Sequence, residues 1–362
     1  MRACDHRIRP APAPTGAILV PMTPIRLAIL CSLALTGCSS HPEPVRGPPL
    51  PRVPLQQAGT PAEEPAEDGF VGFLEDDDLD ESSGLVPSRK HPGIFWSLND
   101  SGGQAVLYAL SDAGAARGRV RVRTAVARDW EDLAVDSTGA LWIHDGGNNA
   151  NRRRDLTVYR VPEPATLDGH VTADRAVRYR FPDQDRFPPP DRMNYDSEAL
   201  FWDGDRMLLL TKHRSDTRTR LFRFPAGVED DATWSAEAMA RPGKKPEPVA
   251  LELLGDFDVG GDPDNHGGHV TAADLSRDGR HLAVLTYHAL FVFERPEGSP
   301  NWLAGAHRRI DFEQSATLQC EAIAWDGDAL LFTNEQGSVM RIANPHDPAC
   351  VRFPSPECRT RQ

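Results

Sequence analysis

A short segment recurs five times between residues 83 and 325 of this 362-residue chain, and this repetition limits what the chain can fold into. Three copies begin with Glu: Glu131-Asp132-Leu133-Ala134-Val135, Glu198-Ala199-Leu200-Phe201-Trp202 and Glu321-Ala322-Ile323-Ala324-Trp325. Two copies carry another residue in its place: Ser83-Gly84-Leu85-Val86 and Ala273-Asp274-Leu275-Ser276. Each copy is short, apolar and bounded by polar residues, which favours a β-strand.

Turn signals and further apolar segments follow these copies. The turns read Ser137-Thr138-Gly139, Asp203-Gly204, Asp278-Gly279 and Asp326-Gly327, and Asp-Gly between apolar segments predicts a hairpin. Second strands are expected at 94–98, 140–144, 207–211, 282–286 and 330–333. Third strands are expected at 107–110, 158–162, 221–225, 291–296 and 339–342, and fourth strands at 120–126, 176–181, 250–259 and 308–312. Repeated units of four short strands predict an all-β fold, a β-propeller.

The repeats indicate five four-stranded blades, and a sixth, degenerate blade is the alternative. The first strands start at residues 83, 131, 198, 273 and 321, so the two long intervals need insertions near 182–194 and 228–247. The fourth strand of the last blade is either Cys350–Phe353 or Phe70–Leu74. The second option closes the ring by pairing its two ends, which removes exposed edge strands.

The N-terminal region reads as an export signal. Arg26 precedes a short apolar segment, residues 27–35, that is too short to span a bilayer. It ends in Leu35-Thr36-Gly37-Cys38, which resembles the lipobox of bacterial lipoproteins and implies cleavage before Cys38 and lipidation of its thiol. Ser39 and Ser40 resemble the sorting pattern for the outer membrane of a Gram-negative cell. The alternative is a plain secretory signal cut nearby.

The domain organisation follows from this signal. Residues 1–37 form the signal peptide, and Met22 is a better start than Met1. Residues 38–69 are a Pro-rich tether that cannot bury a core. Residues 70–362 form the propeller. We therefore expect a monomer on the periplasmic face of the outer membrane, attached to it through the lipid on Cys38.

Charge and motifs exclude several functions. The chain has 53 Asp and Glu against 40 Lys and Arg, a formal charge of −13 that argues against a nucleic-acid partner. It lacks Gly-x-Ser-x-Gly, His-Glu-x-x-His, a Walker loop, Gly-x-Gly-x-x-Gly and Cys-x-x-Cys. Of its six Cys, three follow Cys38 and can form one disulfide. Cys350–Cys358 closes a short loop, and Cys320–Cys358 remains an alternative.

Polar side chains are expected to converge on one mouth of the channel. The starts of the first strands and the ends of the antiparallel second strands meet there. Six carboxylates at these positions are the candidate metal ligands: Asp129, Glu131, Asp145, Asp196, Glu198 and Glu321. Six other residues at the same mouth are candidates for ligand binding: Asn99, Asp100, Lys212, His213, His288 and Glu335.

The chemistry of this mouth is left open between three alternatives. Hard oxygen ligands suit Ca²⁺ rather than Zn²⁺, so Ca²⁺ is the expected cofactor if the mouth binds a metal. Paired carboxylates also raise one another's pKa, which suits a general acid or base. The polar residues could instead bond only to loop backbones. Three nearby segments are read as solvated or incidental: the acidic segment 75–81, His266 with His269, and Arg152-Arg153-Arg154. The alternative for the three arginines is that they hold an anionic substrate beside the mouth.

Several motifs resemble a family of bacterial exported β-propeller lipoproteins of unassigned activity. They are Ser83-Gly84-Leu85, Asn99-Asp100-Ser101-Gly102-Gly103, Asp129-Trp130-Glu131-Asp132-Leu133-Ala134, Val158-Tyr159-Arg160-Val161-Pro162-Glu163-Pro164 and Glu321-Ala322-Ile323. This family is in turn more distantly similar to SdiA-regulated, esterase-like-phytase and NHL-type propellers. The likeness covers about residues 80–345 and implies the fold, not an activity. Relatives carry an acid where this chain has Asn148, which argues against a metal ligand there, and an Arg where it has Leu285.

Two functions are compatible with these observations. The first is a non-catalytic module of the cell envelope that binds a small molecule or a partner at the channel mouth. The second is a Ca²⁺-dependent hydrolase of an ester, lactone or phosphoester, with Glu131, Glu198, Asp145 and Glu321 around the ion. A large insertion over the mouth and inward carboxylates without basic partners would favour the hydrolase.

Overall fold

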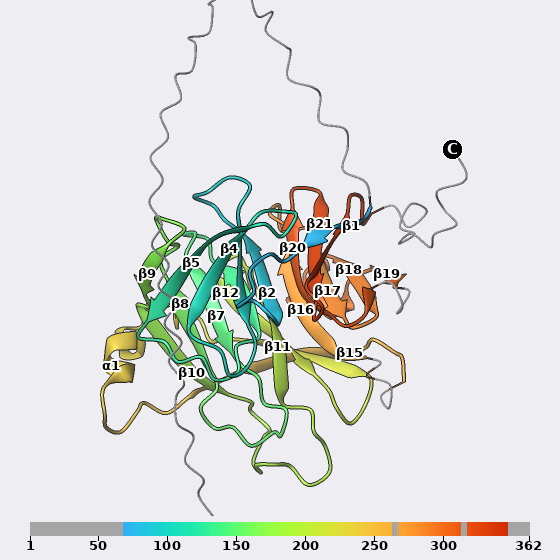
Figure 1. The fold of residues 1–362 in the computed structure, drawn as a ribbon. Helices are drawn as coiled ribbons and strands as arrows, with labels where there is room; N and C mark the ends of the chain where they lie inside the picture. The colour runs from blue at the N-terminus through green and yellow to red at the C-terminus, as the bar shows by residue number, and fades with distance from the viewer. Residues whose placement is uncertain (1–67, 263–265, 267, 313–316, 347–362) are drawn as a thin grey trace, which may run out of the picture. The chain divides into compact units, whose positions relative to one another are not determined.

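Five sheets arranged around a central axis make up the fold of the computed structural model (Figure 1). The structure describes residues 68–262, 266, 268–312 and 317–346. The predicted signal peptide, Cys38, nearly all of the tether, and Cys350 and Cys358 lie outside the described residues. In the described part of the chain the helices are short, and none could cross a membrane.

Each sheet is one blade, and its three inner strands run outward from the axis in chain order. Blade 1 comprises β2 (Ser82–Pro87), β3 (Phe95–Asn99), β4 (Val106–Leu110) and β5 (Ala116–Arg123). Blade 2 comprises β6 (Asp132–Val135), β7 (Leu141–Asp145), β8 (Thr157–Val161) and β10 (Arg175–Arg180). Blade 3 comprises β11 (Asp196–Asp203), β12 (Arg206–Lys212), β13 (Arg218–Arg223) and β15 (Glu252–Asp258).

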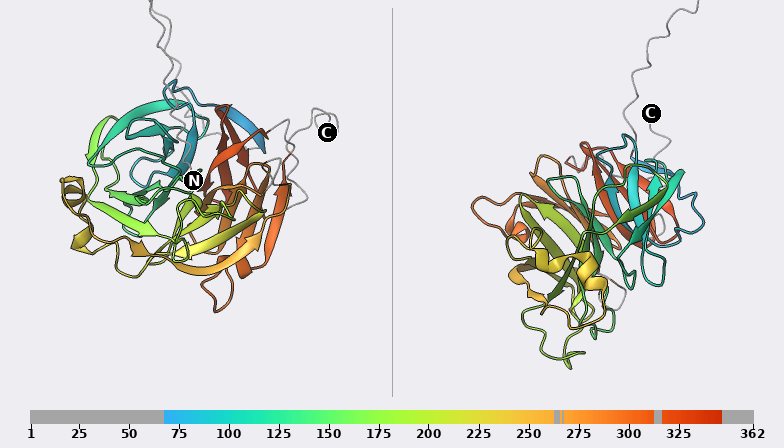
Figure 2. Two further views of the ribbon diagram at one scale, coloured as in Figure 1. Left: turned by 90° about the horizontal axis from the view of Figure 1, so that it is seen from below. Right: turned by 90° about the vertical axis from the view of Figure 1, so that its left-hand side faces the viewer.

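The last two blades complete the ring. Blade 4 comprises β16 (Val270–Leu275), β17 (His281–Thr286), β18 (Ala289–Glu294) and β19 (His307–Asp311). Blade 5 comprises β20 (Cys320–Asp326), β21 (Ala329–Asn334), β22 (Ser338–Ile342) and, outermost, β1 (Gly69–Phe73). The inner strands touch in the order β2, β6, β11, β16, β20 and back to β2 (Figure 2). Five blades are therefore confirmed, and the alternative of a sixth is wrong.

The N-terminal strand closes the ring. β1 pairs antiparallel with β22, with Gly69 opposite Arg341 and Phe73 opposite Ser338. Of the two strands predicted to complete the last blade, the N-terminal one is therefore confirmed, and Cys350–Phe353 lies outside the described residues. Gly69 already belongs to β1, one residue before the predicted start of the propeller at Phe70.

Each blade has two apolar faces because successive residues of a strand point to opposite sides of its sheet. On β2, Leu85 packs in the core between blades 5 and 1, whereas the next residue, Val86, packs in the core between blades 1 and 2. Similar cores join blades 2 and 3, blades 3 and 4, and blades 4 and 5. This is why the first strands read as nearly continuous apolar segments rather than alternating ones.

The two predicted insertions add structure outside the blades. The segment near 228–247 carries η1 (Ala232–Trp234) and α1 (Ala236–Ala240), followed by β14 (Val249–Ala250). β14 pairs parallel with β10 and so extends blade 2, and β9 (Gly169–Thr172) likewise pairs parallel with β5 and extends blade 1. Neither short parallel strand was expected from the repeat pattern.

The channel is filled below its mouth by a buried carboxylate. Asp132 on β6 is completely buried, and its Oδ2 accepts hydrogen bonds from the backbone N–H of Leu200 at 2.8 Å and of Ala273 at 3.5 Å. These two donors belong to blades 3 and 4, so the Asp132 side chain reaches across the axis from blade 2. Asp132 therefore links blades 2, 3 and 4 to one another near the axis.

Candidate functional site

A β-bulge recurs where the first strands begin, at the recurring Glu position. The pairing register shifts between Ser197 and Ala199 in blade 3, and between Cys320 and Ala322 in blade 5, so Glu198 and Glu321 are the extra residues. The same shift falls at Ser83 in blade 1 and at Thr271 in blade 4. The prediction that Ala273 occupies the recurring Glu position was wrong by two residues, since Thr271 is the bulged residue. A bulge re-aims its side chain away from the regular alternation, so the backbone gives these four equivalent positions a special direction.

Blade 2 shows the same feature in a different form. Asp132 pairs with His144, and the backbone N–H of Glu131 also donates to the carbonyl of His144, at 2.8 Å. Two residues therefore face one, as in a bulge. Glu131 is the residue equivalent to Glu198 and Glu321.

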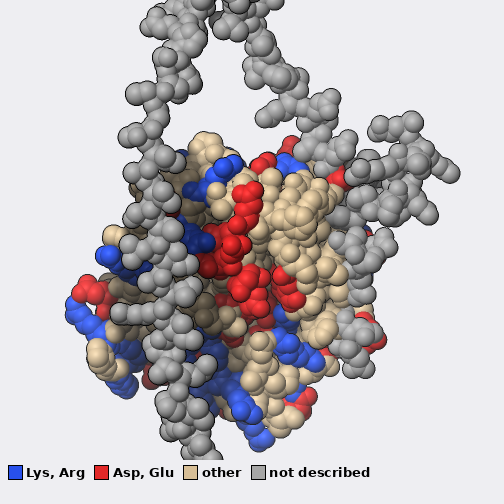
Figure 3. All heavy atoms as spheres, viewed as in Figure 1, with Lys and Arg blue, Asp and Glu red and all other residues tan. Residues whose placement is uncertain are grey.

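Three carboxylates from two blades lie together at this end. One oxygen each from Asp100, Asp129 and Glu131 all lie within 4.8 Å of one another. Asp100 follows the end of β3 in blade 1, and the other two residues precede β6 in blade 2. Among the described residues no basic side chain forms an ion pair with any of the three. Figure 3 shows acidic side chains gathered near the middle of one face of the molecule, with Lys and Arg side chains below them.

Gly147 fits closely beneath two of these carboxylates. A Cβ atom on Gly147 would lie 2.0 Å from Oε1 of Glu131 and 2.5 Å from Oδ2 of Asp129. Its backbone N–H donates to the carbonyl of Asp129 at 3.2 Å, which fixes the loop there. On the other side, the Ser83 hydroxyl donates to Oε2 of Glu131 at 3.5 Å. Only a residue without a side chain leaves room for both carboxylates in this position.

Burial raises the pKa of all three carboxylates. It raises the pKa of Asp100 to about 7, with the charges of Asp129 and Glu81 adding to the effect. It raises the pKa of Glu131 well above its ordinary value, with Glu198 and Asp100 adding. It also raises the pKa of Asp129. Oδ1 of Asp100 is buried without a hydrogen-bond partner among the described residues. A positive charge placed among the oxygens of these three carboxylates would stabilise their ionised form.

Three of the other predicted metal ligands are paired with basic residues instead. Arg153 lies 3.0 Å from Asp145, and Arg214 lies 2.7 Å from Asp196. Nζ of Lys212 lies 3.2 Å from Oε2 of Glu198. Lys212 was predicted at the mouth, whereas Arg153 was read as part of a solvated segment and Arg214 was not singled out.

Glu321 stands apart from both groups. It forms no hydrogen bond or ion pair with the described residues, and burial raises its pKa well above the ordinary value while Lys212 lowers it. Lys212 itself lies 4.8 Å from the centre of the Tyr287 ring, a cation–π contact. The carboxylates of Glu198 and Glu321 raise the pKa of Lys212 despite its burial.

The remaining predicted binding residues are engaged in local contacts. The amide of Asn99 donates to the carbonyl of Asp78, and Glu335 accepts from the side chain of Gln319 at 2.9 Å. His213 is buried, and its Nδ1 lies 2.6 Å from Asp216 rather than among the carboxylates of the mouth. The His288 ring lies 6.1 Å from that of Tyr287, between centroids. Of the six predicted binding residues, Asp100 and Lys212 belong to the charged groups described above, and the charge of Glu335 contributes to the raised pKa of Glu321.

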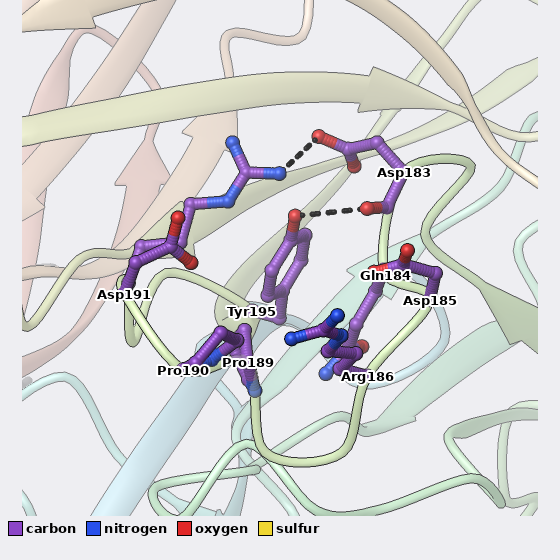
Figure 4. Close-up of a pocket in the computed structure, with 9 residues that line it drawn as sticks. Asp183, Gln184, Asp185, Arg186, Pro189, Pro190, Asp191 and Tyr195 are labelled. Atoms are coloured by element: carbon purple, nitrogen blue, oxygen red, sulfur yellow. Dashed lines mark hydrogen bonds and ion pairs between the residues drawn. The ribbon is translucent and has the colours of Figure 1, made fainter.

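The insertion at 182–194 folds beside the mouth. The backbone N–H of Tyr195 donates to Asn151 at 2.7 Å, and Asn148 donates to the carbonyl of Tyr195 at 2.9 Å, so this insertion and the loop after β7 are held together. The Tyr195 hydroxyl also donates to the carbonyl of Asp183 at 3.2 Å (Figure 4). A cavity of about 230 Å³ lies within the insertion and is lined mainly by charged side chains and proline.

Comparison with known proteins gives no family. No protein-family model matches the chain, and no curated protein matches it. Two similar solved structures are both of virginiamycin B lyase from Staphylococcus aureus. The selenomethionine-substituted form is 12% identical, with a TM-score of 0.35 over 77% of this chain and 74% of that chain. A catalytically inactive form with quinupristin is 11% identical, with a TM-score of 0.34 over 74% and 67%. The fold therefore rests on the sheet topology, and the function on the side chains of the mouth.

Proposed function

We propose that this chain is an exported, lipid-anchored propeller whose channel mouth binds a divalent cation, Ca²⁺, and through it a ligand. The observation that carries the proposal is the group of Asp100, Asp129 and Glu131, whose oxygens lie within 4.8 Å of one another without a basic partner among the described residues. Two oxygens that bind one Ca²⁺ from opposite sides are about 4.6–5.2 Å apart, so the three oxygens fit one ion.

The charge balance of the mouth supports a cation rather than an anion. Three of its carboxylates already have a basic partner each, whereas Asp100, Asp129, Glu131 and Glu321 have none among the described residues. The mouth therefore holds more acidic groups than basic ones, and a bound cation would stabilise their ionised form, whereas an anionic ligand would not. A bound Ca²⁺ would leave coordination positions for water or for ligand oxygens, since three side chains supply fewer than its six to eight ligands.

Calorimetric titration of the cation-free protein with Ca²⁺ tests this site. We expect binding of one ion, and a loss of affinity of about 100-fold in Glu131→Gln, since one of three charged ligands becomes neutral. Glu297→Gln, at an exposed position, is the matched control and should bind as the wild type does. Absence of stoichiometric Ca²⁺ binding, with no loss of stability on chelation, would overturn the proposal.

A Ca²⁺-dependent hydrolase of an ester, lactone or phosphoester is the second candidate. It is favoured by inward carboxylates that lack basic partners, and by an insertion anchored beside the mouth through Asn151 and Tyr195. In such an enzyme the ion would polarise the bound ester and stabilise the negative charge that develops on its oxygen. In such an enzyme Asp129 and Glu131 would be ligands of the ion.

Hydrolysis of p-nitrophenyl esters, of simple lactones and of p-nitrophenyl phosphate distinguishes the two candidates. A hydrolase should release product only with Ca²⁺ present, and Glu131→Gln should lose this activity together with the ion. Ca²⁺ binding without hydrolysis of any of these substrate classes would leave the binding module as the function.

The lipid anchor is a separate part of the proposal. Leu35-Thr36-Gly37-Cys38 and the two serines that follow support lipidation and outer-membrane sorting, in line with the resemblance to exported lipoprotein propellers. Cell fractionation tests it: the wild type should sediment with the outer membrane, and Cys38→Ser should leave the membrane fraction. A Cys38→Ser protein that stays in the membrane fraction would show that the lipobox interpretation is wrong.

A further inference from the structure

Basic side chains from distant parts of the chain gather on the outer part of blade 2. The motif Arg152-Arg153-Arg154 lies in the loop after β7, Arg178 and Arg180 lie on β10, and two more basic residues belong to the insertions. The six outward residues are Arg152, Arg154, Arg178, Arg180, Arg186 and Lys244; we name them the basic patch.

Contacts fix three of these segments to one another. The Arg178 guanidinium donates to the carbonyl of Arg154 at 2.9 Å and to that of Pro246 at 3.2 Å. The Arg154 guanidinium lies 3.9 Å from the centre of the Phe187 ring, next to Arg186 in the sequence. The loop after β7, β10 and both insertions are thereby joined, so the charges are held at this surface by the fold.

These charges are not neutralised within the described part of the chain. None of the six residues forms an ion pair there, although the chain as a whole has an excess of 13 acidic residues. The middle residue of the motif, Arg153, turns inward to Asp145, and the nearby Asp155 pairs with Arg153 and Arg128. Asp185 and Glu247 are the acids beside the patch in the sequence, so the patch keeps a positive charge.

We propose that the basic patch binds an extended, phosphate-bearing polyanion. Side chains two residues apart on a strand, such as Arg178 and Arg180, are separated by about 6.6 Å along it, and the other four basic residues belong to other segments, so an extended anion can contact more of them than one small anion can. Planar guanidinium groups suit phosphate oxygens. A membrane surface fits less well, because the exposed large apolar residues are Phe70, Phe73, Val126, Leu253 and Leu318, and none belongs to these segments.

Binding of linear inorganic polyphosphate to the full chain tests the proposal, with a chelator present so that the channel mouth takes no part. Arg152→Gln/Arg154→Gln should lower the affinity about 25-fold, at roughly fivefold for each guanidinium, and the binding should weaken as salt is raised. The matched control is Arg117→Gln/Arg277→Gln, which removes two exposed arginines without ion pairs from blades 1 and 4. It should bind as the wild type does.

Four results would overturn the proposal. The first is no binding of polyphosphate by the wild type, and the second is an equal loss in both double variants. The third is tighter binding to phosphatidylglycerol vesicles than to polyphosphate, which would assign the patch to a membrane surface. Orthophosphate alone should compete only weakly; competition as strong as that of the polymer would likewise exclude an extended ligand. None of these outcomes depends on Ca²⁺ binding at the mouth.

Discussion

Nζ of Lys212 lies 3.2 Å from Oε2 of Glu198, and both side chains are almost completely buried at the channel mouth. The two residues come from neighbouring antiparallel strands of blade 3, where the bulge at Glu198 turns its carboxylate toward the lysine. Burial of two such charges away from water costs free energy. Their mutual attraction offsets this cost only while both partners are present.

Removal of one partner should therefore destabilise the fold. Lys212→Met leaves the buried Glu198 carboxylate without its ammonium partner, so we expect the free energy of unfolding to fall by about 3–5 kcal/mol. Adding Glu198→Gln to this variant should recover part of the loss. Urea denaturation of the four proteins of this double-mutant cycle measures the coupling. Additive effects of the two substitutions would contradict a direct interaction.

Substitution of two glycines should separate effects on the carboxylate site from effects on the packing between blades. In Gly147→Ala the new Cβ meets the ends of the Glu131 and Asp129 side chains, which can move aside. We expect weaker Ca²⁺ binding, by at least about tenfold, with little change in stability. In Gly84→Ala the Cβ would lie 2.8–2.9 Å from backbone atoms of Asp132 and Leu133 in the next blade, which cannot move independently. That variant should lose stability, by about 1–3 kcal/mol in thermal or urea unfolding.

The buried Asp132 should contribute to holding three blades together. Asp132→Ala leaves the N–H groups of Leu200 and Ala273 without their acceptor, at a cost of about 1–3 kcal/mol for each buried group. Urea denaturation should show this loss, whereas the exposed Asp230→Ala should unfold as the wild type does. A stability equal to that of the wild type would mean that water replaces the carboxylate.

Stability should also depend on pH through Asp274. Burial raises the pKa of Asp274 to about 7, although the backbone N–H of Trp325 donates to it and lowers the pKa. The folded chain therefore binds this proton more tightly than the unfolded chain, in which the pKa is about 4. The contribution of Asp274 to stability is complete below about pH 4 and is lost as the pH rises to about 7.

Chemical denaturation across this pH range, with a chelator present, checks the effect. Asp274→Asn cannot lose a proton and keeps an oxygen for the Trp325 N–H, so its stability should fall less steeply between about pH 4 and 7. Asp100, Asp145 and Asp196 have raised pKa values of about 7 as well, and a part of the slope should remain in the variant. Identical slopes for variant and wild type would show that Asp274 is ionised throughout.

The sequence predicts the blades well because each repeat carries its own local signals. Apolar segments and Asp-Gly turns identify the inner three strands of every blade to within a few residues. The short parallel strands β9 and β14 were missed because their segments have no repeat equivalent. The recurring Glu was noticed, but not the bulge that directs it, since a bulge is a property of pairing between two strands.

The candidate site was predicted only in part. Counting along the strands correctly gathers Asp129, Glu131 and Asp100 at one mouth, since antiparallel strand ends must meet. It does not indicate that Asp145 and Asp196 would be paired with Arg153 and Arg214. Those arginines reach the mouth from loops, whose course depends on hydrogen bonds that no local pattern encodes.

The pairing of β1 with β22 sets the order in which the fold can form. Gly69 is made early in synthesis, whereas its partner Arg341 is among the last of the described residues to be added. Contacts between positions so far apart in sequence are slow to form, because a long loop must close first. The aromatic pair of Phe70 and Phe73 lies on this strand, and both side chains stay largely exposed even after β1 has paired. Closure of the ring therefore needs both ends of the described chain, because β1 has no partner strand until β22 has been made.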